Sequence, residues 1–175
     1  MKIIKYSVYT LATLVFAVGV LLISMRFADG PWGIIAGGAS SSGEMYQGEE
    51  PDWSFLRDRE TVEFQLENPT RSRTTWIVEH EGKIYIPSGY MNSTVGKIWK
   101  KWPLEAEKDG RAILRVDDTM YERQLVRITE GPEVVPVLQL LAEKYGLGQA
   151  GDPEAAMEAV TSGSVWLFEM APVSS

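Results

Sequence analysis

Alternating apolar and polar positions mark the folded part of the chain. Between Thr61 and Glu67, the residues Val62, Phe64 and Leu66 alternate with polar ones, which is the period-two pattern of a half-buried strand. Runs rich in β-branched and aromatic residues predict five more strands, over residues 74–79, 83–87, 111–116, 120–129 and 164–170. Short turns that contain Gly82 or two adjacent aspartates join four of these runs, which predicts two hairpins.

Helices are predicted between and after these strands. Apolar residues at helical spacing over 133–145 stop before Gly146, and residues 95–102 form a shorter helical stretch. Asp152 followed by Pro153 has the pattern of a helix N-cap with proline in the first turn. Together the elements predict a mainly β (α+β) fold, a closed or partly open six-stranded antiparallel barrel with peripheral helices.

The N-terminus has a different pattern. Residues 6–25 form an uncharged run of 20 positions, long enough at about 1.5 Å per residue to cross a hydrocarbon layer of about 30 Å. The run is longer than a typical signal-peptide core, and Arg26 stands where cleavage after Ala28 would require a small residue. We therefore predict a transmembrane anchor helix over residues 1–29, with a cleaved signal peptide as the alternative.

The charges flanking this run predict its orientation. Lys2 and Lys5 precede it, whereas Arg26 and Asp29 nearly cancel after it. Because positive charge favours the cytoplasmic side, we expect a single-pass protein of the inner (plasma) membrane. Its N-terminus would be cytoplasmic and its C-terminal domain extracytoplasmic or periplasmic.

Residues 30–57 separate the anchor from the folded domain, which is expected over 58–175. The first part, residues 30–48, contains six Gly and three consecutive Ser, so it cannot hold one helix or strand over its length. An acidic stretch follows. The segment is expected to be a linker or an irregular wrap, in which Trp32, Ile34 and Ile35 pack on the domain or on the membrane surface.

Composition excludes several classes of function. Residues 27–175 hold all 24 acidic residues but only 14 of the 17 Lys and Arg, a net charge of −10, which argues against nucleic-acid binding. The absence of Cys excludes disulfides, thiolate metal sites and a cysteine nucleophile. His80 is the one histidine, so a multi-histidine metal site is excluded, and a Ser-His-Asp triad is disfavoured. No metal cofactor is expected.

The order of the segments resembles the split β-barrel flavin and deazaflavin oxidoreductases, which include pyridoxamine-phosphate-oxidase-like and deazaflavin-dependent nitroreductase-like proteins. In residues 71–128, a basic and hydroxyl-rich segment leads into a strand and a hairpin. A loop, a short helix containing Lys97-Ile98-Trp99 and the strands RAILRV and YERQLVRI follow. Near the C-terminus, SVWLFEMAP resembles the closing strand. The resemblance covers roughly residues 58 to 145 and implies a split barrel that binds FMN or a deazaflavin.

A cofactor phosphate would need cations and hydroxyl donors. The candidates at the start of the second strand are Arg71, Arg73, Thr74 and Thr75. Alternation of side chains prevents all four from facing one ligand. The alternative is that both arginines are solvated and pair weakly with nearby acids, Glu67 or Asp58.

The resemblance places the other contacts in and after the following loop. It implies Lys97 as a second phosphate contact, with Ser88, Tyr90 and Asn92 lining the loop beneath it. Trp99 or Trp102 is then a candidate to stack on the isoalloxazine ring. The alternative is an exposed loop before a helix whose lysines are solvated and whose tryptophans are core residues.

Local charge supports a phosphate between these two segments. Residues 71–75 and 97–101 hold five cations and no acid, whereas the domain as a whole is strongly acidic. A doubly charged phosphate is tolerated only where cations outnumber acids.

Two functions follow as hypotheses. The first is a membrane-anchored flavin- or deazaflavin-dependent oxidoreductase that acts on a small organic acceptor. The alternative is a cofactor-free split-barrel binding module or accessory subunit of a membrane complex, because one fold hosts many functions. In either case we expect a homodimer or a heteromeric membrane partner, since an open barrel exposes strand edges and this superfamily commonly completes its site between two subunits.

Overall fold

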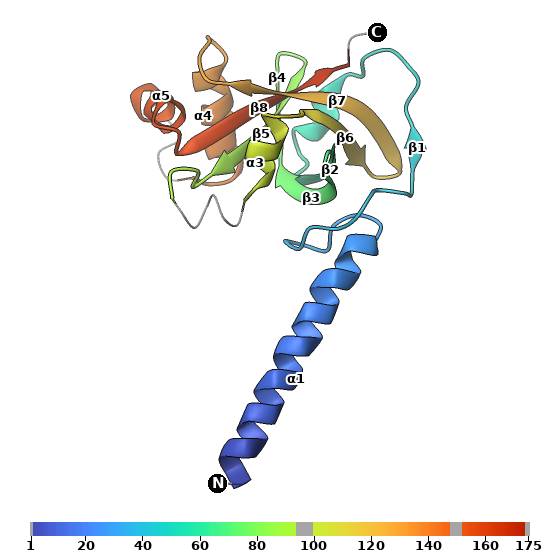
Figure 1. Ribbon diagram of the computed structural model, residues 1–175. Coiled ribbons are helices and arrows are strands. Elements are labelled where there is room, and N and C mark those ends of the chain that lie inside the picture. Colours follow the sequence, from blue (N-terminus) through green and yellow to red (C-terminus); the bar gives the residue numbers. More distant parts are fainter. Residues whose placement is uncertain (1, 94–99, 148–151, 174–175) are drawn as a thin grey trace.

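The strands form one sheet that curls toward a barrel (Figure 1). The computed structural model describes residues 2–93, 100–147 and 152–173. The strands of this described part are β1 (Glu44–Met45), β2 (Thr61–Glu67), β3 (Thr70–Trp76), β4 (Val78–His80), β5 (Lys83–Gly89), β6 (Arg111–Val116), β7 (Thr119–Ile128) and β8 (Val165–Pro172). Their order is β3-β2-β6-β7-β8-β5-β4 with antiparallel neighbours, and β1 pairs with β7 in parallel. The sheet curls so far that β3 also lies beside β5.

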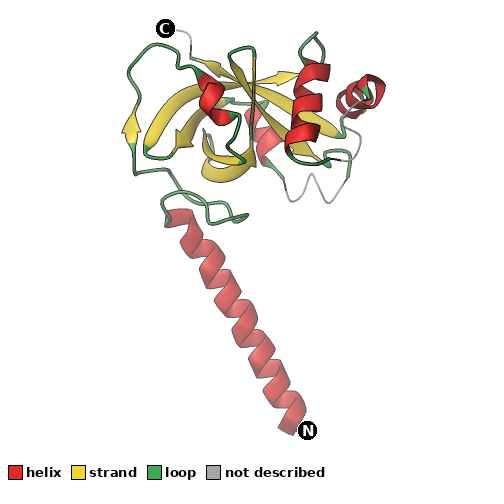
Figure 2. Ribbon diagram, turned by 180° about the vertical axis from the view of Figure 1, so that it is seen from behind, coloured by secondary structure: helices red, strands yellow, loops and turns green. Residues whose placement is uncertain are grey.

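Helices lie at the periphery of the sheet (Figure 2). They are α1 (Lys2–Ser24), α3 (Trp102–Ala106), α4 (Val134–Lys144) and α5 (Pro153–Thr161), with the short 3₁₀ helices η1 (Met25–Phe27) and η2 (Trp53–Leu56). Val137 and Leu141 of α4 pack on Val78, Tyr85 and Leu167, which come from β4, β5 and β8. The α4 helix therefore covers the outside of the sheet near the approach of β3 to β5.

The main core fills the inside of the curled sheet. Phe64, Leu114 and Phe168 point inward from three strands and are fully buried. Trp53 and Leu56 of η2 belong to the same core. The segment before β2 therefore contributes buried side chains to the barrel.

The predicted count of six strands is wrong, because eight are present among the described residues. One of the two extra strands is β1. The other arises because the predicted strand 74–79 is divided at Ile77. Its N–H donates to the Tyr145 hydroxyl at 2.9 Å, and its carbonyl accepts from Lys144 Nζ at 2.9 Å. Since α4 occupies these backbone groups, the chain changes its pairing partner there, from β2 to β5.

The helix predicted over residues 95–102 falls mostly on residues 94–99, outside the described residues. Its predicted end at Trp102 is wrong, because α3 begins there and continues to Ala106. Pro103 lies in the first turn of α3, where the missing N–H of proline leaves no hydrogen bond unmade. The helices predicted over 133–145 and from Asp152 correspond to α4 and α5.

The N-terminal helix extends away from the domain (Figure 1). The span Ile4–Phe27 has 24 residues and is long and apolar enough to cross a membrane. None of the residues in its most apolar part is buried against the rest of the protein. By length and composition it fits either a single membrane anchor or a signal sequence.

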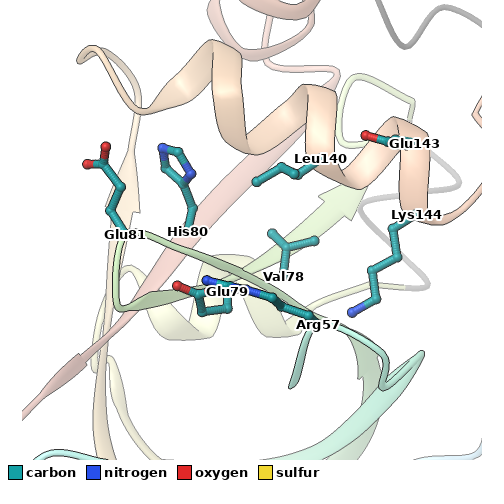
Figure 3. Close-up of a pocket in the computed structure, with 8 residues that line it drawn as sticks. All are labelled: Arg57, Val78, Glu79, His80, Glu81, Leu140, Glu143 and Lys144. Carbon is teal, nitrogen blue, oxygen red and sulfur yellow. Dashed lines mark hydrogen bonds and ion pairs between the residues drawn. The ribbon is translucent and has the colours of Figure 1, made fainter. Parts of the chain in front are cut away.

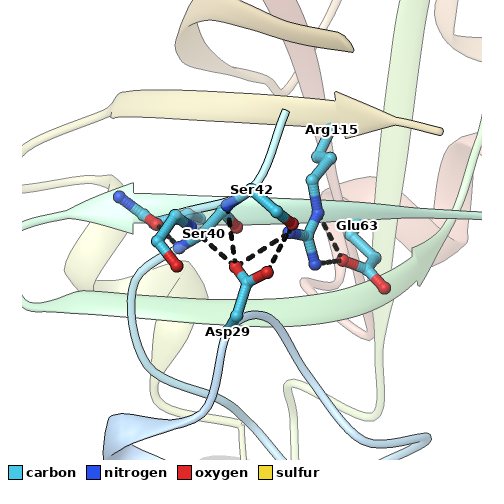
Figure 4. A network of polar contacts seen from close by, with 7 residues as sticks. Asp29, Ser40, Ser42, Glu63 and Arg115 are labelled. Carbon is cyan, nitrogen blue, oxygen red and sulfur yellow. Dashed lines mark hydrogen bonds and ion pairs between the residues drawn. The ribbon is translucent and has the colours of Figure 1, made fainter. Parts of the chain in front are cut away.

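A polar network holds the chain after this span against the barrel (Figure 4). Asp29 accepts the N–H of Ser41 at 2.6 Å and the hydroxyl of Ser42. Arg115 of β6 lies 2.9 Å from Asp29 and donates to Glu63 of β2. The hydrogen bond from the Ser42 hydroxyl, with the Ser41 N–H and the Arg115 charge, lowers the pKa of Asp29. We call these five residues the Asp29 clamp.

The chain beyond the clamp also pairs with the edge of the sheet. The N–H of Gly37 donates to the carbonyl of Ser72 at 3.0 Å, and the Ser72 N–H donates to Gly38 at 3.2 Å. A side chain at position 37 would lie 1.7 Å from the carbonyl oxygen of Gly30, so only glycine fits there. These contacts hold residues 29–42 along the barrel as an irregular wrap.

Asp29→Asn is expected to loosen this wrap, because asparagine keeps the side-chain shape but loses the charge that faces Arg115. The measurement is amide hydrogen exchange over residues 29–42 in the full chain, and Asp118→Asn in an exposed turn is the control. Unchanged exchange in Asp29→Asn would contradict the clamp. The pKa of Asp29 in the folded protein lies below its ordinary value of 3.8. The ionised Asp29 therefore stabilises the fold fully above pH 3.8, and this stabilisation is lost as the pH falls through the pKa of the folded protein.

Candidate functional site

A cleft of about 550 Å³ opens where β3 approaches β5. Its walls are the end of β3, the end of β5, the starts of α3 and β8, and one face of α4. The apolar residues of its floor are Leu138, Leu141, Leu147 and Val165. The cleft is therefore a mainly apolar groove at the split of the barrel.

Three aromatic side chains line this cleft: Trp76, Tyr90 and Trp102. Trp102 is buried and packs edge-on against Phe64, with ring centroids 5.0 Å apart. Trp76 is partly exposed and stacks on Tyr145, with centroids 4.4 Å apart and planes at 10°. Both tryptophans are thus held by neighbours, which gives the cleft two preset aromatic surfaces.

Among the described residues that line the cleft, the cation is Lys100. Its Nζ lies 3.4 Å from the Gly89 carbonyl and 5.7 Å from the centre of the Tyr90 ring. Burial lowers the pKa of Lys100, as expected for an amine next to apolar walls. Lys100 was counted among the five cations of residues 71–75 and 97–101, but Lys97 was selected as the contact instead. The signal that pointed toward it was the lysine cluster at 97–101.

Four of the residues predicted from the sequence meet in the cleft. Thr74 and Thr75 come from β3, while Ser88 and Tyr90 come from the end of β5 and the loop after it. Ser88 is buried, and its hydroxyl lies 3.5 Å from the sulfur of Met91. The structure therefore brings together two segments that no local pattern connects.

Of the other loop and helix candidates, Asn92 is the one that the structure describes, and it is not among the described residues of this lining. Asn92 is exposed, and its Oδ1 lies 3.3 Å from where a side chain on Gly163 would begin. Lys97 and Trp99 lie outside the described residues. Their roles remain predictions from the family resemblance.

The two arginines of β3 lie outside the lining and have partners of their own. Arg73 Nη2 is 3.3 Å from Glu105 of α3, and Arg71 Nη2 donates to the Ala36 carbonyl at 3.0 Å. Burial lowers the pKa of Arg73, and Glu105 opposes that effect. The expected pairing with Glu67 or Asp58 is not what the structure shows. The acid-free environment expected around residues 71–75 is also wrong, because α3 brings Glu105 to this place.

A second cavity of about 460 Å³ lies between β4 and α4 (Figure 3). Three of its charged groups, Arg57, Glu79 and Lys144, are engaged within the protein. Arg57 Nε donates to Glu79 at 2.6 Å, and Lys144 Nζ donates to two backbone carbonyls at 2.8 and 2.9 Å. His80 lies at the rim beside the hairpin turn. These groups hold η2, β4 and α4 together, which is a structural role.

Among the residues that the structure describes, no group of three or more His, Asp or Glu side chains is placed to hold a metal ion.

No family model matches the chain, and no curated protein matches it significantly. The fold is similar to the crystal structure of the conserved hypothetical protein Rv2991 from Mycobacterium tuberculosis, with a TM-score of 0.51 and 13% identity over 74% of this chain and 82% of that one. A NimC/NimA family protein from Clostridium acetobutylicum aligns with a TM-score of 0.42 and 12% identity, over 66% of this chain and 74% of that one. The similarity to Rv2991 shows the fold, and the split barrel implied by the sequence resemblance is confirmed.

Proposed function

We propose that this split-barrel chain binds FMN or a deazaflavin in the cleft between β3 and β5 and acts as a membrane-anchored oxidoreductase on a small organic acceptor. A bound flavin or deazaflavin supplies the hydride chemistry, while the protein binds and orients it and excludes water. The observation that carries the proposal is the lining of the cleft: two fixed tryptophans, an apolar floor, hydroxyl groups and one lysine.

The lining fits the parts of such a cofactor. The volume of about 550 Å³ lies within the range of roughly 300 to 1,000 Å³ that is usual for cofactor sites. A planar ring system requires a flat apolar wall, which the exposed Trp76 offers, while Trp102 lines the cleft as a residue of the main core. Thr74 and Thr75 are hydroxyl donors for a ribityl chain, and Lys100 is the cation for an anionic group.

The same proposal includes cofactor contacts by the other residues predicted from the sequence, which are Arg71, Arg73, Asn92, Lys97 and Trp99. For Arg73, contact with a phosphate requires that its pairing with Glu105 be exchanged for the ligand. Both side chains are mostly buried, and their separation is 3.3 Å, so the exchange requires that the phosphate replace the charge of Glu105.

Titration of the purified full chain tests the proposal. The chain in detergent is titrated with riboflavin, FMN and a deazaflavin, and binding is followed by cofactor fluorescence and absorbance. We expect binding of at least one cofactor and a preference for FMN over riboflavin, because Lys100 favours an anion. No binding of any of the three would refute the cofactor-dependent function.

A second candidate is supported by the state of the arginines. Both predicted phosphate ligands on β3 are already engaged, Arg73 by Glu105 and Arg71 by the Ala36 carbonyl. A barrel that needs no cofactor would keep such internal contacts. The alternative is therefore a cofactor-free binding module or an accessory subunit of a membrane complex.

Glu105→Gln tests whether Arg73 belongs to the phosphate site. Removing the carboxylate releases Arg73, so FMN affinity is expected to rise by up to about tenfold while riboflavin affinity stays constant. Glu122→Gln, an exposed site with the same charge change, is the control. Equal FMN affinities in Glu105→Gln and wild type would remove Arg73 from the phosphate site.

The remaining features of the proposal concern the membrane and the assembly. We propose that residues 1–29 stay attached as a single-pass anchor of the inner (plasma) membrane, that the N-terminus is cytoplasmic, and that 30–57 and 58–175 follow outside it. We also propose a homodimer or a heteromeric membrane partner, because an open barrel exposes strand edges that need to be covered. A reporter fused after Ser175 that is active only in the cytoplasm would contradict the orientation, and a monodisperse monomer at micromolar concentration would contradict the homodimer.

A further inference from the structure

Three large apolar side chains at the end of the membrane span are left uncovered by the domain. Phe27 is 86% exposed, Trp32 is 65% exposed and Ile34 is 90% exposed. We call them the juxtamembrane patch. The sequence left open whether Trp32 and Ile34 pack on the domain or on the membrane surface, and in the structure they do not enter the core.

The loop that carries two of these residues is ordered by its own hydrogen bonds. Trp32 and Ile35 exchange both backbone hydrogen bonds at 3.0 Å, which closes a tight turn. Gly33 has a φ of +56° at the first central position of this turn, where glycine is favoured. The turn therefore presents Trp32 and Ile34 in a defined way.

The loop is also fixed beside the end of α1. The N–H of Gly38 donates to the Ala28 carbonyl at 3.1 Å, which closes the loop at its base directly after the span. The Asp29 clamp then attaches the same segment to β2 and β6 (Figure 4). Consequently, the patch, the end of the span and the barrel move as one unit.

The charge near the patch suits a lipid surface. The acid nearest to the span, Asp29, is paired with Arg115, which also pairs with Glu63. Arg26, at the end of the span, is exposed. Burial lowers the pKa of Arg71, and the nearby charge of Arg26 lowers it further. An exposed cation beside tryptophan and aliphatic side chains is typical of the membrane interface.

We infer that Phe27, Trp32 and Ile34 are buried in the headgroup region of the bilayer and hold the barrel directly on the membrane surface. This inference rests on the proposed membrane anchor. The continuity of the patch with the span selects lipid as its occupant, because any chain that ends a span at Phe27 brings the neighbouring turn to the same interface.

The chain contains no Cys, so a fluorophore can be attached to one introduced cysteine at a time without labelling any other position. Ile34→Cys tests the patch, Leu14→Cys tests the span, and Phe55→Cys is the control, an exposed apolar residue of η2. Each full-length variant carries an environment-sensitive fluorophore in phosphatidylcholine vesicles. The vesicles contain bromine either near the headgroups or deep in the acyl chains.

The label at position 34 is expected to lose most of its emission with shallow bromine, while the label at 14 is quenched by deep bromine and the label at 55 by neither. Quenching at 14 without quenching at 34 would overturn the inference and leave the anchor intact. Absence of quenching at 14 would refute the anchor itself. Equal quenching at 34 and 55 would show that the whole domain adsorbs to lipid, which also overturns a specific contact by the patch.

Discussion

Replacing Lys100 with methionine is expected to weaken FMN binding by about ten- to a hundredfold. Methionine keeps most of the side-chain volume between Gly89 and Tyr90 but removes the charge of the cleft. A hydrogen bond to a charged group contributes about 1.5 to 3 kcal/mol, which corresponds to this change in affinity. The measurement is the Kd of FMN by fluorescence titration of the full chain.

Lys101→Met is the matched control, because Lys101 is adjacent but exposed. It should leave the Kd of FMN nearly unchanged, and riboflavin should bind Lys100→Met almost as well as wild type. The burial that lowers the pKa of Lys100 also means that FMN affinity falls with rising pH before a free lysine would lose its proton. Equal FMN affinity in Lys100→Met and Lys101→Met would exclude Lys100 as the anion contact.

Trp53→Ala is expected to lower the free energy of unfolding by about 3 to 5 kcal/mol. Trp53 is fully buried, and its ring lies edge-on to Tyr121 with centroids 5.0 Å apart. The guanidinium of Arg123 lies 4.6 Å from the ring centre, and the indole N–H donates to Glu50 at 2.6 Å. Truncation therefore leaves a large cavity and separates Glu50 and Arg123 from a common partner.

Denaturant unfolding of the full chain, followed by circular dichroism, measures this loss. Phe55→Ala is the control, since Phe55 lies two residues away but is largely exposed, and its loss should stay below about 1 kcal/mol. A similarly small loss for Trp53→Ala would show that residues 30–57 act as a linker that the barrel does not need. The predicted large loss would instead make the end of this segment a part of the folded domain.

Much of the fold was readable from the sequence because its signals are local. The strands β2, β6 and β8 follow period-two or continuous apolar patterns, and α4 and α5 carry helical spacing with terminal signals. These patterns depend on neighbours within a few residues. The division of the predicted strand at Ile77 had no such signal, because its cause is Tyr145 and Lys144, more than 60 positions later in the chain.

The candidate site divides in the same way. Residue chemistry selected Thr74 and Thr75 as candidate contacts, and the family resemblance implied Ser88 and Tyr90. All four residues line one cleft. Residue chemistry also identified Arg73 as a free cation beside them. The structure pairs Arg73 with Glu105, 32 residues away, and places Lys100 in the cleft.

By itself the sequence determined the apolar N-terminal helix, the mainly β domain, most element positions and the exclusion of cysteine and multi-histidine chemistry, since these follow from composition and short-range periodicity. Only the tertiary structure decided which charged side chains form ion pairs with one another. Arg115 meets Asp29 across 86 positions, and Arg123 meets Glu50 across 73. An ion pair depends on distance in space, which the folded sheet sets and which spacing along the chain does not reveal.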